Sequence, residues 1–137
     1  MGRFWVWALV YLGAFAGLSM AYHLHLHETP RRVLFAVDSS YPMHSVWSDV
    51  RTTLEQWQRN RHYTVFSVVT DKGRVHGWQP QASLQQVQPY APRNLALLLD
   101  AQRHAEYQQA DSIVLITNAA DAGELELPKR TVLVRLP

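Results

Sequence analysis

The sequence predicts an α/β protein, with a short, Rossmann-like, mostly parallel sheet and one antiparallel edge strand, preceded by a single transmembrane helix. Three observations lead to this fold class. An uncharged apolar run opens the 137-residue chain. Two later apolar runs, 33–37 and 113–117, show no alternation, which is typical of strands buried on both faces. Segments with helical spacing lie between them. We therefore divide the chain into an anchor with a His-rich linker, 1–30, and a domain, 31–137.

The amino-acid composition excludes several classes of protein. Apolar residues make up 47% of the chain, which excludes wholesale disorder. Lys and Arg number 13 against 11 Asp and Glu, and this small excess gives no support for a nucleic-acid partner. Because the chain has no cysteine, disulfide scaffolds, thiol nucleophiles and cysteine-ligated zinc sites are excluded.

The first element is the apolar run from Phe4 to Tyr22. Its 19 residues carry no charge. As a helix they would be about 28 Å long, close to the thickness of the hydrocarbon core of a bilayer. Trp5 and Trp7 near one end are typical interfacial anchors. A signal peptide cleaved after Ala21 is the alternative, but the early tryptophans and the full-length run favour a retained single-span anchor.

The small residues on this helix indicate that it packs against another membrane helix. Gly13 and Gly17 are four residues apart, so one face can approach another membrane helix closely. We expect other membrane protein subunits and membrane lipid as partners. A three-residue head before the helix most simply stays in the cytoplasm. This favours a protein of a bacterial inner membrane with its domain on the periplasmic side.

Three histidines follow the apolar run: His23, His25 and His27. In an extended chain all three would face one way, whereas in a helix only His23 and His27 would do so. Three imidazoles can bind zinc or copper, so a metal-carrier role is one alternative. The other is a polar collar where the helix leaves the membrane, which we favour because no carboxylate at matching spacing completes a site.

The first half of the domain predicts a strand, a helix and a hairpin. Residues 33–37 are the first strand. Apolar residues then recur at helical spacing, which predicts an amphipathic helix over about 45–60. Residues 63–70 are rich in β-branched and aromatic residues and predict a second strand. After a tight turn, 74–78 alternates as a third strand, antiparallel to the second.

The second half predicts one more helix and two more strands. A Gln- and Pro-rich loop is followed by Asn94, a plausible N-cap for a helix over about 95–108. A strand over 113–117 and a last strand over 131–136 complete the sheet. We expect right-handed crossovers, the two helices on opposite faces, and thin cover over one face near the last two strands.

An ordered set of motifs runs through the domain. The first strand ends in Asp-x-Ser at 38–40, with Met43 just after it. An edge hairpin follows the first helix, Asn94 opens the second, and the strand 113–117 leads into a loop. Over roughly 32–121 these motifs resemble the von Willebrand factor A family. The resemblance implies a shortened domain of that fold.

The resemblance also implies a place for a divalent cation, the metal-ion-dependent adhesion site. Its Asp-x-Ser-x-Ser loop, a Thr and an Asp supply oxygens that suit Mg²⁺. Asp38 and Ser40 match the first two ligands. Pro42 stands at the second Ser, Arg93 at the Thr and Asn118 at the Asp. Three of five positions therefore depart from the family pattern.

These departures predict a degenerate site without metal and without a cofactor. A guanidinium about 4 Å from a divalent cation would repel it by several kcal/mol at an effective dielectric near 20. We therefore expect Arg93 to occupy the place of the cation and to pair with Asp38, which Ser40 would hold.

Catalytic patterns are missing from the same residues. A phosphatase of the haloacid dehalogenase type needs a second carboxylate where Ser40 stands. The serines at 39 and 40 have no flanking glycine, as a nucleophile turn requires. The sequence also has no Gly-rich phosphate loop. We therefore expect a protein that is not an enzyme.

The function expected from the sequence is that of an accessory or assembly subunit of a larger membrane complex, acting by protein–protein binding. The predicted partner-binding loops are 39–44, 89–94 and 118–122. Their candidate residues are Asp38, Ser40, Tyr41, Arg93 and Asn118, together with Gly13 and Gly17 on the anchor. Two alternatives stay open: an Mg²⁺-dependent adhesion module that uses Asp38 and Ser40, and the metal carrier based on the histidines.

Overall fold

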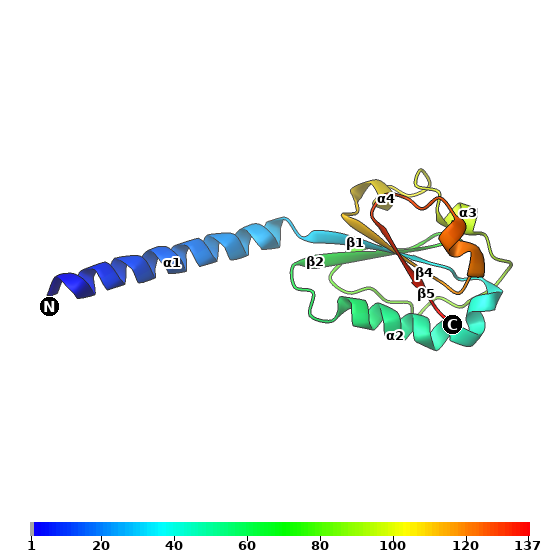
Figure 1. Cartoon of the computed structure of the whole chain (residues 1–137), viewed down its shortest axis with the longest axis horizontal. Coiled ribbons are helices and arrows are strands. Elements are labelled where there is room, and N and C mark those ends of the chain that lie inside the picture. The colour runs from blue at the N-terminus through cyan, green and yellow to red at the C-terminus, as the bar shows by residue number, and fades with distance from the viewer. Residues whose placement is uncertain (1) are drawn as a thin grey trace. The chain divides into compact units, whose positions relative to one another are not determined.

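The computed structural model describes residues 2–137. These residues form two compact units, 2–30 and 31–137. Figure 1 shows the helical first unit and the α/β second unit. Each unit is described below by itself.

The first unit is one helix, α1 (Gly2–Glu28). Its 27 residues extend for about 40 Å at 1.5 Å per residue. No residue of this helix is buried within the chain. Its length and composition are sufficient to cross a membrane, a property that a signal sequence near an N-terminus shares. The helix runs six residues beyond the uncharged stretch, so the three histidines are helical as well.

The second unit is built on a five-stranded sheet in the order β3-β2-β1-β4-β5. Neighbouring strands are parallel except for β2 and β3, which form an antiparallel pair. The strands are β1 (Arg31–Val37), β2 (Thr64–Thr70), β3 (Arg74–Gln79), β4 (Ser112–Thr117) and β5 (Thr131–Arg135). The predicted α/β class, with a mostly parallel sheet and one antiparallel edge strand, is confirmed.

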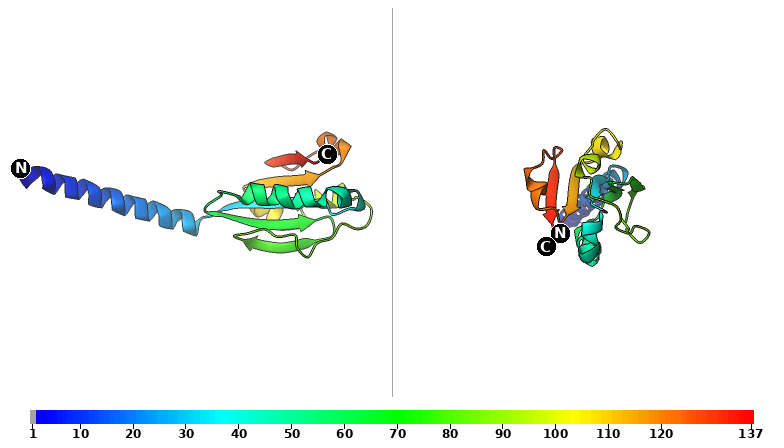
Figure 2. Two further views of the ribbon diagram at one scale, coloured as in Figure 1. Left: turned by 90° about the horizontal axis from the view of Figure 1, so that it is seen from below. Right: turned by 90° about the vertical axis from the view of Figure 1, so that its right-hand side faces the viewer.

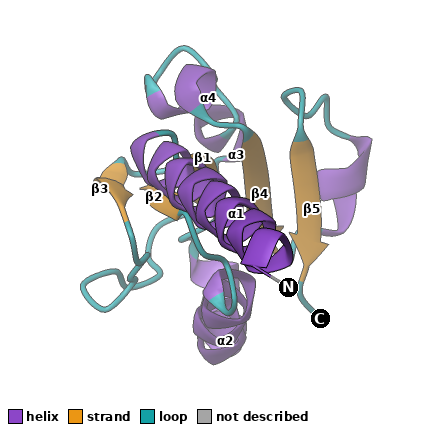
Figure 3. Ribbon diagram, turned by 90° about the vertical axis from the view of Figure 1, so that its left-hand side faces the viewer, coloured by secondary structure: helices purple, strands orange, loops and turns teal. Residues whose placement is uncertain are grey.

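Helices cover both faces of this sheet, as predicted (Figures 2 and 3). On one face lies α2 (Trp47–Gln58), preceded by the 3₁₀ helix η1 (Tyr41–Val46). Val50 and Leu54 of α2 belong to one core cluster with Phe35 and Phe66, whose rings stack at 5.6 Å. On the other face lie the short helices α3 (Leu95–Leu98) and α4 (Glu106–Gln109). Alternate residues of each buried strand therefore enter opposite cores.

The predicted helix over 95–108 is wrong in its middle, where the chain forms turns between α3 and α4. Asn94 does cap α3, because its side chain accepts a hydrogen bond from Leu97 N. The helix ends at Leu98, and two residues further on the Asp100 carboxylate accepts from Gln102 N at 3.0 Å. Such local hydrogen bonds compete with the helical ones. The predicted helix over 45–60 is also shorter at both ends, because residues 45 and 46 belong to η1 and α2 ends at Gln58.

The edge strand β5 is the thinly covered part of the sheet. Val132 is 45% exposed, and Val134 and Leu133 are only partly buried. The helix η2 (Ala120–Glu124) precedes this strand, and no long helix in the described residues 2–137 joins β4 to β5. The predicted thin cover near the last two strands is therefore confirmed for β5, whereas β4 is buried.

An ion pair between β3 and α4 predicts that the stability of the fold depends on pH. Arg74 Nη1 donates to Oε1 of buried Glu106 at 2.9 Å. Burial raises the pKa of Glu106, but the hydrogen bond and the charge of Arg74 outweigh it and hold the pKa below its usual 4.5. A depressed pKa stabilises the fold above pH 4.5, and that contribution is lost as the pH falls through the folded-state pKa.

We therefore expect Glu106→Gln to lower the free energy of unfolding by about 1 kcal/mol at neutral pH, since Arg74 is half exposed. The difference from the wild type should shrink as the pH falls below 4.5. Urea unfolding of both chains at several pH values measures this difference. A constant gap between the two chains down to acidic pH would contradict the assignment.

Candidate functional site

The candidate site lies where the parallel strands end. Asp38 directly follows β1, Asp71 follows β2 and Asn118 follows β4. Because β1 lies between β2 and β4, the carboxyl ends of the three strands meet at one edge of the sheet. Both carboxylates are buried: Asp38 is 1% and Asp71 is 6% exposed. Buried carboxylates require partners, and each of these two has a cation beside it.

Asp38 is fully engaged by its neighbours. Its Oδ2 accepts from Arg93 Nε at 2.8 Å and from the hydroxyl of Thr117, also at 2.8 Å. Its Oδ1 accepts from Ser40 N at 3.0 Å. The expected pairing of Arg93 with Asp38 is therefore present in the structure. Thr117, the last residue of β4, was not among the candidates from the sequence because it was assigned only to a strand.

Arg93 also contacts the loop that follows β4. Its Nη2 donates to Oδ1 of Asn118, and Asn118 Nδ2 donates to the carbonyl oxygen of Pro42 at 2.9 Å. The guanidinium thus bridges the loops that follow β1 and β4. This arrangement does not fit a divalent cation, because the guanidinium and the cation would compete for the same carboxylate oxygen.

Ser40 holds Asp38 as expected, but through its backbone and not through its side chain. Its hydroxyl is buried and has no hydrogen-bond partner in the described chain. The backbone amide of Ser40 holds Asp38 instead. The turn after β1 places that N–H two residues beyond the carboxylate, the geometry of an Asx turn.

Asp71 forms a second ion pair that sequence reasoning missed. Its Oδ1 accepts from Ser39 Oγ at 2.7 Å and from Ser39 N at 3.3 Å. Its Oδ2 lies 2.5 Å from Lys72 Nζ, which also donates to the carbonyl of Ser39 at 3.0 Å. The signal for this pair is the register of β1 and β2. Val37 lies opposite Thr70, so the residues that follow them are neighbours.

The two buried ion pairs, Asp38–Arg93 and Asp71–Lys72, fix the loops of the site, and we call them the platform. Two carboxylates and two cations give no net charge. The Ser39 hydroxyl donates to the Asp71 carboxylate, which Lys72 also holds. The arrangement therefore holds the loop after β1 on three sides, through β2, β4 and the segment that carries Arg93.

Two exposed tyrosines lie above this platform. Tyr41 N donates to the carbonyl of Ala91, and Tyr90 N donates to the carbonyl of Ser39, both at 2.9 Å. These two hydrogen bonds fasten the loops 39–44 and 89–94 to each other. Tyr41 is 67% and Tyr90 is 55% exposed. Exposed aromatic side chains on a fixed backbone are typical of protein-binding surfaces.

The candidate residues of the first unit are arranged along α1. The His23 and His27 rings lie 5.2 Å apart, and His25 lies on a different face of the helix. Within residues 2–137, no three His, Asp or Glu side chains are grouped in a way that could hold a metal. At Gly13 and Gly17 an added Cβ would meet nothing within 4 Å. The face that these glycines share is open for another helix.

Comparisons of the chain with known protein families, with curated proteins and with solved structures find no match. The function is therefore inferred from the chain's own residues. Those residues offer an apolar helix, a platform of two buried ion pairs, and two joined loops that present tyrosines.

Proposed function

We propose that this chain is a membrane-anchored binding subunit of a larger membrane protein complex, and that it is not an enzyme. Its domain acts as a divergent member of the von Willebrand factor A family whose metal site is replaced by an ion pair. The single observation that carries the proposal is the position of Arg93 between Asp38 and Asn118. An arginine there joins the loops permanently, so partner binding needs no added cation.

The binding surface in this proposal is the joined loop set 39–44 and 89–94, with 118–122 beside it. Tyr41 and Tyr90 are its anchors, because large aromatic side chains bury much area with little loss of conformational freedom. The platform below contributes by fixing the loop backbones before binding, which lowers the entropic cost of association.

The Mg²⁺-dependent alternative is less favoured by this geometry. A divalent cation at the Asp38 carboxylate would lie near the Arg93 guanidinium. At about 4 Å their repulsion would be about twice the roughly 4 kcal/mol of a unit pair at an effective dielectric near 20. The metal-carrier alternative is less favoured because α1 separates His25 from His23 and His27.

The anchor serves the same function in this proposal. The open face with Gly13 and Gly17 packs against a helix of the partner complex. Confinement to one membrane raises the effective concentration of the domain near its partner. We also propose that the domain lies on the periplasmic side of a bacterial inner membrane. Fusions of a periplasm-active and a cytoplasm-active reporter to the C-terminus test this orientation.

The test of the proposed function is purification of the tagged full-length chain from gently solubilised membranes, with bound proteins identified by mass spectrometry. We expect a stoichiometric set of membrane subunits that remains bound in chelator. Tyr41→Ala should reduce the recovered partner at least tenfold if this side chain is a central anchor. Val132→Ala, at an exposed apolar position on the distant strand β5, is the matched control and should recover the wild-type amount.

Two results would contradict the proposal. One is recovery of the chain alone under conditions that keep other membrane complexes intact. The other is a partner that leaves when chelator is added, because that result assigns the surface to a cation-dependent adhesion module.

A further inference from the structure

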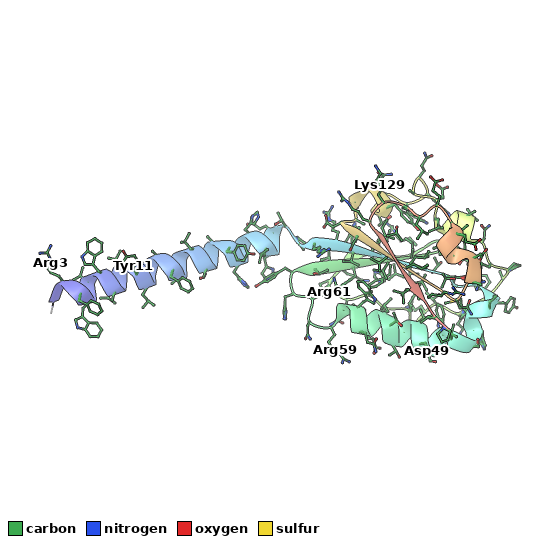
Figure 4. The ribbon with its side chains drawn as sticks, viewed as in Figure 1. Arg3, Tyr11, Asp49, Arg59, Arg61 and Lys129 are labelled. Carbon is green, nitrogen blue, oxygen red and sulfur yellow. The ribbon has the colours of Figure 1, made fainter. Side chains whose placement is uncertain are left out.

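The edge of the sheet opposite the candidate site carries a group of arginines, defined here as the arginine edge: Arg31, Arg32, Arg59 and Arg61. Arg31 and Arg32 open β1. Arg59 and Arg61 lie in the connection between α2 and β2, and Figure 4 shows both at the end of α2. Arg31 lies opposite Thr64 in the sheet, and its N–H donates to the carbonyl of Tyr63 at 2.9 Å. The two pairs of arginines are therefore neighbours.

These four side chains are exposed and carry uncompensated charge. The ion pairs within residues 2–137 are Asp71–Lys72, Glu106–Arg74 and Asp38–Arg93, so none of the four arginines takes part in one. Two acids of the domain lie beside these arginines: Asp111 contacts the backbone of Arg32, and the carbonyl of Glu55 accepts from Arg59 N. The Asp111 carboxylate accepts from the Arg32 backbone N–H at 2.8 Å rather than from its guanidinium. Four positive charges thus face two negative ones.

Aromatic rings and a groove complete this edge. The Arg61 guanidinium lies 4.8 Å from the centre of the Trp57 ring, and that of Arg32 lies 5.8 Å from the Trp78 ring. Both tryptophans are partly buried. A groove between the last turns of α2 and residues 80–85 is lined by Arg59 and Arg61. Arginine and tryptophan together are typical of surfaces that meet the headgroup region of a bilayer.

Chain connectivity keeps this edge near the membrane. Only Thr29 and Pro30 separate the end of α1 from Arg31. The six helical residues after Tyr22 rise about 9 Å, and the fully extended connection adds about 10 Å, so Arg31 stays within about 20 Å of the end of the apolar run. If α1 spans a membrane, the arginine edge is the part of the domain that is tethered to its surface.

We propose that the arginine edge docks on the phosphates of anionic lipid headgroups and so fixes the domain against the membrane. This inference rests on the anchoring part of the proposed function and goes beyond it. The partner it fits is an anionic lipid surface, because each arginine beside such a surface favours the docked state about fivefold. Docking at this edge turns the opposite edge, with Tyr41 and Tyr90, away from the membrane.

The test uses the full-length chain in lipid nanodiscs, with hydrogen exchange of the backbone amides of residues 59–63 as the readout. We expect exchange to be slower in discs that contain phosphatidylglycerol than in discs of phosphatidylcholine alone. Arg31→Gln with Arg59→Gln should lower the ratio of docked to free domain about 25-fold. Arg135→Glu lowers the net charge by the same two units at the carboxyl end of β5, the opposite end of the sheet, and should keep the protection.

Each other outcome overturns the docking proposal. Equal exchange in the two kinds of disc does so. Equal loss of protection in the double arginine variant and in Arg135→Glu does so as well, because it would indicate a general effect of net charge. Release by sodium phosphate beyond that by sodium chloride of equal ionic strength would indicate a site for free phosphate. Protection by single-stranded RNA on phosphatidylcholine discs would assign the edge to nucleic acid. Incorporation into discs tests the anchor separately, so its failure is distinguishable from failure of docking.

Discussion

Arg93→Ala is expected to lower the free energy of unfolding of the domain by about 3 kcal/mol, because it leaves the Asp38 carboxylate buried without its cation. The arginine contacts both Asp38 and Asn118, so its loss also separates the loops that follow β1 and β4. For a domain of this size the melting temperature should fall by about 13 °C. Thermal unfolding of the full-length chain in mild detergent, followed by near-ultraviolet circular dichroism, measures the shift.

Two further variants separate the charge effect from lost packing. Asp38→Asn in the Arg93→Ala background removes the uncompensated charge and should recover part of the lost stability. Arg135→Ala, an exposed arginine at the end of β5, should change the stability by less than about 0.5 kcal/mol. If Arg93→Ala melts like the wild type, Arg93 does not act as the replacement for a cation.

The second large effect is expected at Asp71. Asp71→Ala removes the acceptor of both the hydroxyl and the N–H of Ser39, which are buried. Leaving two buried donors without a partner should cost about 2–3 kcal/mol. Urea unfolding of the full-length chain measures this loss. The amide of Ser39 should also exchange faster, because it has lost its hydrogen bond.

Two other variants serve as controls for this prediction. Asp71→Asn keeps a side-chain oxygen as the acceptor and should lose only about 1 kcal/mol. Asp121→Ala changes an exposed carboxylate in η2 and should be almost neutral. Equal stability of Asp71→Ala and Asp121→Ala would show that Asp71 does not hold the loop after β1.

The strands could be predicted because strands that are buried on both faces have a recognisable sequence pattern. The continuous apolar runs in β1 and β4 have no polar face, as a central position in a parallel sheet requires. The helix over 95–108 was predicted wrongly because the spacing of the apolar residues takes no account of Asp100. Its carboxylate offers the backbone a turn instead of another helical hydrogen bond.

The site was predictable only in part, for a related reason. Asp38 and Arg93 were paired by matching residues to a family pattern, and the structure brings them together. The Ser39–Asp71 contact depends on the register of β1 with β2, and the Thr117–Asp38 contact on that of β1 with β4. Register is a property of the assembled sheet. A residue that looks like part of a turn or a strand end in the sequence therefore becomes a partner only in three dimensions.

The most direct test of the central claim, that Arg93 takes the place of a metal ion, is the melting temperature of the full-length chain in millimolar Mg²⁺ or Ca²⁺ and in chelator. The claim predicts the same melting temperature for the domain in all three conditions. A cation bound at a hundred times its Kd would add about 2.7 kcal/mol to the stability. A clear rise in melting temperature with Mg²⁺, abolished by Asp38→Asn, would contradict the claim.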